Sequence, residues 1–238
     1  MIMKCPLLPV IFLFSVVLIS SCSARVDGVV LDGGSAEVEL SASLGPRTIA
    51  LIRSVRGFMG ETNEAPILDG PGISGSMSTA PGINSINLVN NSPSVIGGAI
   101  SISNVGDFLA LAGTESRLIT YTNEANHSSI IIYLDMENAP LFVSMLSPEV
   151  EEYLMTLMVP FVVGERFTKD EYLALLTAVY GAPLADEIRG ASIRALIQFP
   201  RPVRSVEGGA YTGRNAEFNI SLLDLLVLEE PLRYEVRW

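Results

Sequence analysis

Few side chains in the sequence are of the types that carry out nucleophilic or acid–base catalysis. His127 is the only histidine, which excludes a Ser-His-Asp triad and zinc sites built on several histidines. It lies in a polar turn sequence, which is typical of a solvated residue. A Ser-Lys dyad would depend on Lys169, but Lys169 fits a capping box over residues 168–171 at a helix start. We therefore expect a protein that is not an enzyme.

Carboxylates supply most of the remaining chemistry. The formal net charge of −11 does not favour nucleic acid as a partner. Asp135 and Glu137 end a predicted strand, but two acidic residues without an oxygen-rich loop are weak evidence for calcium, and we expect no metal. Glu149, Glu151 and Glu152 fall in a predicted first helical turn, where they complement the helix dipole. A hydrolase that uses acidic residues alone would need two carboxylates roughly 5 to 9.5 Å apart, and it is the alternative.

One glycine motif resembles a nucleotide-binding fingerprint. Residues 70–75 match G-x-G-x-x-G, which places a pyrophosphate at a helix N-terminus only when a helix follows the glycines. Here Pro71 interrupts the motif and no helical pattern follows it. The segment is predicted to be a loop, and no cofactor is expected.

Arginines form the one basic segment in this acidic chain. Arg189, Arg194, Arg201 and Arg204 occur with no acidic residue between positions 188 and 206. If the loop 200–205 brings Arg201 and Arg204 together, the two are candidates to bind a phosphate or carboxylate group. The alternative is that these arginines pair with acidic side chains elsewhere in the fold.

An apolar segment provides a second candidate binding feature. Between Leu141 and Val163 the apolar residues exceed what one amphipathic helical stripe requires. We interpret them as a candidate surface for an amphiphile or an apolar partner, and the alternative is that they form core. The candidate residues are Phe142, Met145, Leu154, Met158 and Phe161.

The N-terminal residues predict export and lipid attachment. Lys4 precedes an apolar stretch, Leu7–Ile19, that is too short to span a bilayer, as in a signal peptide over residues 1–21. Residues 19–22, Ile-Ser-Ser-Cys, match a bacterial lipobox, in which the thiol of Cys22 accepts diacylglycerol; Cys5 is lost with the signal peptide. The alternative is an ordinary signal peptide. We expect a protein anchored by its lipid to a membrane of the bacterial cell envelope, on the periplasmic or surface face.

The elements that carry these residues indicate a single α+β domain over residues 28–238, after a tether at 22–27. The sequence predicts an N-terminal hairpin (29–31 and 36–42), a helix capped by Ser43, and strands at 83–89, 99–103, 117–122 and 129–135. A helical block at about 138–190 follows, and alternating strands return at 193–199, 216–220 and 232–238. We expect a largely antiparallel sheet built from the N- and C-terminal hairpins.

The C-terminal strands carry a family resemblance. The strand Ile193–Phe199, followed by Pro200, Val203, Val206 and a glycine-containing hairpin, resembles the LppM-like bacterial lipoprotein domain. Arg201 stands where that family usually has glycine, and the C-terminal membrane helix common in the family is not present before Trp238. The resemblance implies an α+β envelope lipoprotein without enzymatic activity, in contact with envelope lipids.

These observations favour one function over two others. We expect a membrane-tethered, non-catalytic binding or structural module, for lipids or for a protein partner in the envelope. The alternatives are the carboxylate-dependent hydrolase and a component of an envelope assembly whose β edge pairs with a partner.

Overall fold

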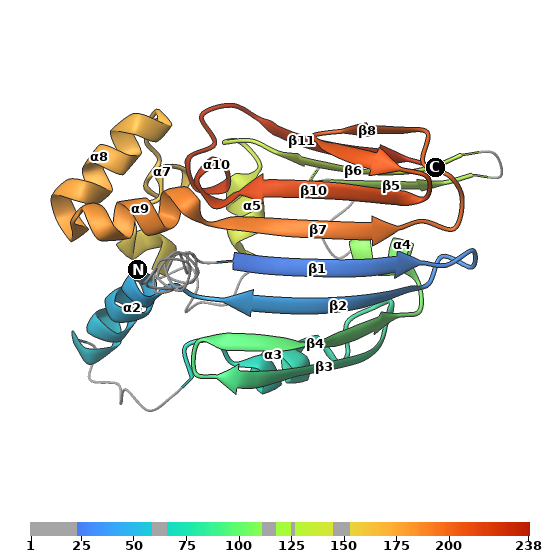
Figure 1. Cartoon of the computed structure of the whole chain (residues 1–238), viewed down its shortest axis with the longest axis horizontal. Coiled ribbons are helices and arrows are strands. Elements are labelled where there is room, and N and C mark those ends of the chain that lie inside the picture. The colour runs from blue at the N-terminus through green and yellow to red at the C-terminus, as the bar shows by residue number, and fades with distance from the viewer. Residues whose placement is uncertain (1–22, 59–65, 111–117, 125–126, 145–152) are drawn as a thin grey trace, which may run out of the picture.

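The computed structural model describes residues 23–58, 66–110, 118–124, 127–144 and 153–238 (Figure 1). Helices and mostly antiparallel strands are mixed along it, so the predicted α+β class is confirmed. Several predictions fall outside the described residues and stay predictions. They concern the signal peptide (1–21), Cys22, Met145, the side chain of Phe142, and the acidic residues Glu149, Glu151 and Glu152.

A seven-stranded sheet, the large sheet, forms the front of the molecule in Figure 1. Its described strands are antiparallel except for β1 and β7, which run parallel with Val26 opposite Ala195. Because β1 begins at Ser23, the expected tether at 22–27 was wrong for residues 23–27, which lie in a paired strand. In spatial order the strands are β3 (Ile83–Ser92), β4 (Val95–Ile102), β2 (Ala36–Ser43), β1 (Ser23–Val30), β7 (Ser192–Gln198), β10 (Asn215–Ser221) and β9 (Gly209–Thr212).

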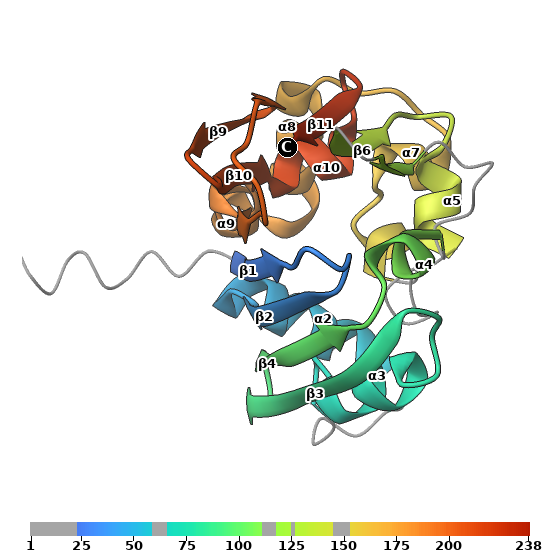
Figure 2. The same cartoon turned by 90° about the vertical axis from the view of Figure 1, so that its right-hand side faces the viewer.

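A separate four-stranded sheet, the small sheet, packs against the inner side of the large one. Figure 2 looks along the strands and shows the large sheet curving from β9 and β10 through β1 to β3, with β6 and β11 across from it. The two-sheet arrangement was not predicted. The strands of the small sheet are β5 (Ile119–Asn123), β6 (Ser128–Leu134), β11 (Leu232–Arg237) and β8 (Ser205–Glu207).

Most of the helices gather at one end of the sheets, where α2, α7, α8, α9 and α10 lie together in Figure 1. The predicted helical block contains α5, α7, α8 and α9 among the described residues. None of the described helices is long and apolar enough to cross a membrane. The helices are α2 (Pro46–Phe58), α3 (Gly70–Met77), α4 (Val105–Leu109), α5 (Ala139–Ser144), α7 (Pro160–Val163), α8 (Lys169–Tyr180), α9 (Ala182–Gly190) and α10 (Leu222–Val227).

Two helix starts differ from their predictions. Ser43 lies in β2, and α2 begins at Pro46, where the buried carboxylate of Glu187 accepts hydrogen bonds from the backbone N–H groups of Arg47 (3.0 Å) and Thr48 (2.8 Å). The predicted loop at 70–75 is instead the start of α3. By contrast, the capping box at 168–171 is present as predicted and begins α8.

The helical end has its own core, in which Val159, Tyr172 and Leu176 are fully buried. Phe161 is 7% exposed within this core, and Leu154 packs against it. The prediction of an apolar binding surface was therefore wrong for Phe161, which is buried in this core, whereas Leu154 is half-buried and its role stays a prediction. Met158 is half-buried and adopts a positive φ of 51°.

Glu235 in β11 gives a test of acid stability. It is 5% exposed and accepts hydrogen bonds from Arg233 and Arg237. Burial alone would raise the pKa of its carboxyl, but the two arginines outweigh burial and hold the pKa below its ordinary value. A carboxyl with a lowered folded-state pKa stabilises the fold above its unfolded pKa of about 4.3 and loses this contribution as the pH falls through the folded value.

We expect Glu235→Gln to lower the urea midpoint at about pH 7. The difference in urea midpoint between the variant and the unmodified chain should shrink as the pH falls from about 4 to about 3. Urea unfolding at each pH measures the difference. A difference that stays constant across this range would contradict the prediction.

Candidate ligand-binding cavity

The two sheets face each other across a cavity of about 410 Å³. Its wall is almost entirely apolar, because inward side chains from both sheets and from α4 line it. They include Val26, Ala195 and Ile197 of the large sheet, Ile130 and Ile132 of the small sheet, and Phe108 of α4. The volume lies within the range of small-molecule binding sites, which are mostly apolar with a few polar groups at fixed positions.

The strand pattern explains why this wall is apolar. Successive residues of a strand point to opposite faces, so Val26, Gly28 and Val30 of β1 share the inner face with Ala195 and Ile197 of the neighbouring β7. Ala195 is small, and the side chain of Ile197 fills the space beside Gly28, where an added Cβ would lie 2.9 Å from Cδ1 of Ile197. The alternation predicted for residues 193–199 therefore agrees with the cavity wall in β7, whereas the inner face of β1 at Val26 lies in a segment that was predicted to be a tether.

The cavity wall is accessible to solvent at some of its residues. Ile132 keeps 40% of its surface exposed although it lines the cavity. Ala195 and Ile197 are only half-buried in the middle of a seven-stranded sheet. Large apolar side chains exposed in a concave wall are typical of a ligand-binding site.

The fold resembles that of LppM. The NMR structure of the folded domain of Mycobacterium tuberculosis LppM matches with a TM-score of 0.43 and 12% sequence identity, over 91% of this chain and 88% of that chain. No family model matches the chain, and no curated protein matches it.

A smaller polar pocket of about 280 Å³ lies beside the cavity. Val30 lines both spaces. Phe199 lines the cavity and stacks on Trp238, which lines the polar pocket, with 4.4 Å between ring centroids. The two spaces are therefore neighbours, at the end of the molecule that carries Trp238 (Figure 1).

Arg201 supplies the positive charge of the polar pocket. It is half-buried, and its Nη2 donates a hydrogen bond to the buried Oγ of Ser128 (2.7 Å), which in turn donates to Oδ1 of Asn123 (2.8 Å). Burial raises the pKa of the neighbouring Tyr121, and the charge of Arg201 opposes that rise. Arg201, which the sequence suggested as a candidate contact for an anionic group, thus lines a pocket.

Of the other three arginines of the basic segment, two form ion pairs and one is exposed outside the polar pocket. Arg189 pairs with Asp186, and Arg194 pairs with Glu217 at 2.7 Å, as the alternative prediction required. Arg204 is exposed and does not line the polar pocket. The structure therefore does not bring Arg204 to the pocket with Arg201, and the prediction of a paired site was wrong in this respect.

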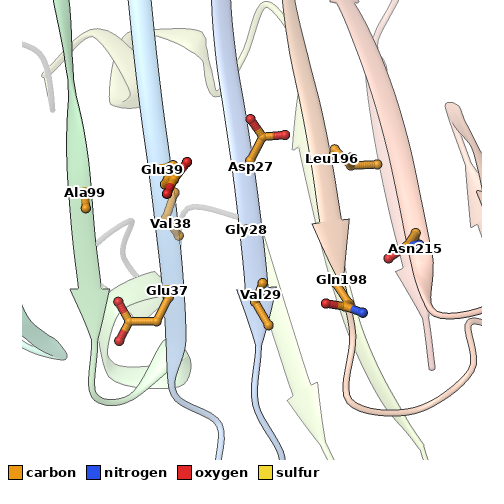
Figure 3. Close-up of a pocket in the computed structure, with 10 residues that line it drawn as sticks. All are labelled: Asp27, Gly28, Val29, Glu37, Val38, Glu39, Ala99, Leu196, Gln198 and Asn215. Atoms are coloured by element: carbon orange, nitrogen blue, oxygen red, sulfur yellow. The ribbon is translucent and has the colours of Figure 1, made fainter.

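The outer face of the large sheet carries a wider depression of about 550 Å³, shown in Figure 3. Asp27, Glu37 and Glu39 line it from β1 and β2, and Figure 3 shows Glu37 pointing away from the other two. Asp27 is already paired with Arg25, whose Nη2 lies 2.9 Å from Oδ1. Hydrogen bonding to that guanidinium lowers the pKa of Asp27. The wall is open and mixes polar with apolar side chains, so it offers an apolar ligand less burial than the cavity between the sheets.

The remaining acidic candidates serve local structure. Oδ1 of Asp135 accepts hydrogen bonds from the backbone N–H groups of Glu137 and Asn138, each at 2.9 Å. His127 is exposed, with Nδ1 3.4 Å from Glu124. Within the described parts of the chain, no group of three or more His, Cys, Asp or Glu residues is placed to hold a metal ion.

Proposed function

We propose that this protein is a non-catalytic binding module of the bacterial cell envelope, tethered to a membrane by a lipid on Cys22, which takes the apolar part of a lipid or other amphiphile into the cavity between its sheets. The observation that carries the proposal is the apolar cavity of about 410 Å³, lined by both sheets. Transfer of apolar surface from water into such a space stabilises binding by about 0.8 kcal/mol per CH₂ group.

The cavity supports binding more than catalysis. Among the described residues that line it, the one ionisable group is the hydroxyl of Tyr234, whose pKa is raised by burial. An apolar wall of this kind provides neither a general base nor a nucleophile near neutral pH. The site is therefore suited to holding a ligand without changing it.

The test is to fill the cavity. Ala195→Phe adds a ring to an inner position of β7, and each excluded methylene group costs the ligand about 0.8 kcal/mol. Exclusion of two such groups weakens binding about tenfold. The measurement is the displacement of a fluorescent apolar dye from the full chain by a long-chain fatty acid.

The matched control is Ala99→Phe, which adds the same ring to the exposed outer face of β4. We expect this variant to bind dye and fatty acid as the unmodified chain does. Absence of saturable dye binding to the unmodified chain, or equal affinities in both variants, would contradict the proposal.

A further inference from the structure

We propose that the polar pocket beside the cavity binds the zwitterionic headgroup of the same amphiphile, a phosphate ester that also carries an ammonium group. This assignment rests on the proposed function and specifies the chemical class of its ligand. The apolar chain would lie between the sheets, and the headgroup would lie against Arg201.

The positions of the two spaces suit a ligand with one apolar and one polar end. The apolar cavity and the polar pocket share Val30, and Phe199 of the cavity wall stacks on Trp238 of the pocket wall, so the two spaces are neighbours. A molecule whose chain is attached directly to a short headgroup can occupy both. Neither a fatty acid nor a free phosphate would use both spaces fully.

Arg201 is placed and held as a phosphate contact. Its side chain is half-buried, lines the pocket, and forms no ion pair with any described residue. The hydrogen bond to Ser128 uses one N–H of a guanidinium that has several, and Ser128 itself donates a hydrogen bond to Asn123. A planar guanidinium held in this way is suited to binding two phosphate oxygens at once.

The pocket also carries negative charge, which restricts the kinds of charged ligand that it can bind. Asp32, from the β1–β2 turn, and Glu124, next to β5, line it together with Arg201. One arginine and two carboxylates leave the pocket with a net negative charge, which disfavours a phosphate that has no positive group. A phosphodiester that carries an ammonium group complements both signs of charge, with phosphate at Arg201 and ammonium near the carboxylates.

Trp238 provides the readout, because it is the only tryptophan of the chain and lines the pocket. The full chain is titrated with two lysophospholipids of the same acyl chain, one with an ethanolamine and one with a glycerol headgroup, below the concentration at which they form micelles. We expect saturable changes in emission and about threefold tighter binding of the ethanolamine lipid, since exposed ion pairs contribute modestly. Phosphoethanolamine without an acyl chain should bind much more weakly than either.

Two sets of variants test the roles of the charges. Arg201→Gln should weaken binding of both lysolipids about tenfold or more, since hydrogen bonds to charged groups are among the strong ones. The matched control, Arg204→Gln, changes an exposed arginine outside the pocket and should leave both affinities unchanged. Asp32→Asn combined with Glu124→Gln should remove the preference for ethanolamine.

The outcomes separate this proposal from the proposed function. Equal affinity for the two headgroups, or unchanged binding by Arg201→Gln, would overturn the headgroup assignment and leave the cavity as the ligand site. Equal binding of phosphoethanolamine with and without its acyl chain would overturn the joined site. If neither the lysolipids nor the apolar dye bind, the proposed function itself fails.

Discussion

Replacing Phe199 with alanine is expected to lower the free energy of unfolding by about 3 to 5 kcal/mol, the usual cost of removing a buried aromatic ring. Phe199 is 1% exposed, directly after β7, and its ring stacks on Trp238. Its backbone N–H donates to the carbonyl of Arg214 at 2.8 Å, so the truncated residue stays in place and leaves a void. The large and small sheets would lose a shared packing contact.

The measurement is urea unfolding followed by far-ultraviolet circular dichroism, because the emission of Trp238 would itself change when the neighbouring ring is removed. Leu196→Ala is the matched control: Leu196 lies in the same strand, on the outer face, and is 36% exposed. We expect the control to lose less than about 1 kcal/mol. Similar losses in the two variants would show that Phe199 does not join the sheets.

The second large effect is expected at Glu187, which lies far from α2 in the sequence and whose carboxylate caps the N-terminus of that helix. Besides the two backbone N–H groups, its Oε1 accepts a hydrogen bond from the hydroxyl of Thr48 at 2.7 Å. Glu187→Ala leaves these donors without their acceptor at a part-buried helix start. We expect a loss of about 2 to 4 kcal/mol, which combines the cost of a lost cap with that of unsatisfied donors.

Gly45→Ala tests the same contact from the opposite side, since an added Cβ would collide with the carboxyl group of Glu187. Thermal unfolding should show a lower midpoint for both variants. The control is Asp186→Ala, which removes an exposed ion pair with Arg189 and should change stability by less than about 0.5 kcal/mol. A midpoint for Glu187→Ala equal to that of the control would refute the capping role.

Local patterns in the sequence predict much of the strand content. The hairpin predicted at 29–31 and 36–42 corresponds to the paired strands β1 and β2, although residues 23–27 of β1 were predicted to be a tether. Alternation also predicts the apolar inner faces of β7 and β10, which pair in the fold. The division into two sheets depends on which distant strands pair, as β11 does with β6 and β8. Strand alternation contains no information on the choice of distant partner.

Helix α3 shows how tertiary contacts override local preference. Glycine and proline in residues 70–75 disfavour a helix. The structure compensates with Oδ1 of Asp69, which accepts from the N–H of Gly72 at 3.0 Å, and with Oγ of Ser74, which accepts from Leu88 in β3 at 2.8 Å. The first of these contacts joins residues three positions apart, whereas the second joins α3 to a strand fourteen positions away, which local sequence patterns do not indicate.

The candidate site was predictable in part. The basic segment drew attention to Arg201, which lines the polar pocket, while its contact with an anionic group stays a prediction. Arg194 has the same local sequence character, yet β10 brings Glu217 beside it. The cavity depends on the spacing between the two sheets, which cannot be predicted from the residue types along the chain.

The parallel pairing of β1 with β7 has a consequence for the order of folding. The first described strand completes its hydrogen bonding only when residues 192–198 are available, and β6 pairs with the last strand of the chain. Contacts of such long sequence separation slow folding, because the entropy of closing a long loop opposes them. A growing chain therefore cannot complete the large sheet before residues 192–198, or the small sheet before residues 232–237, have been synthesised.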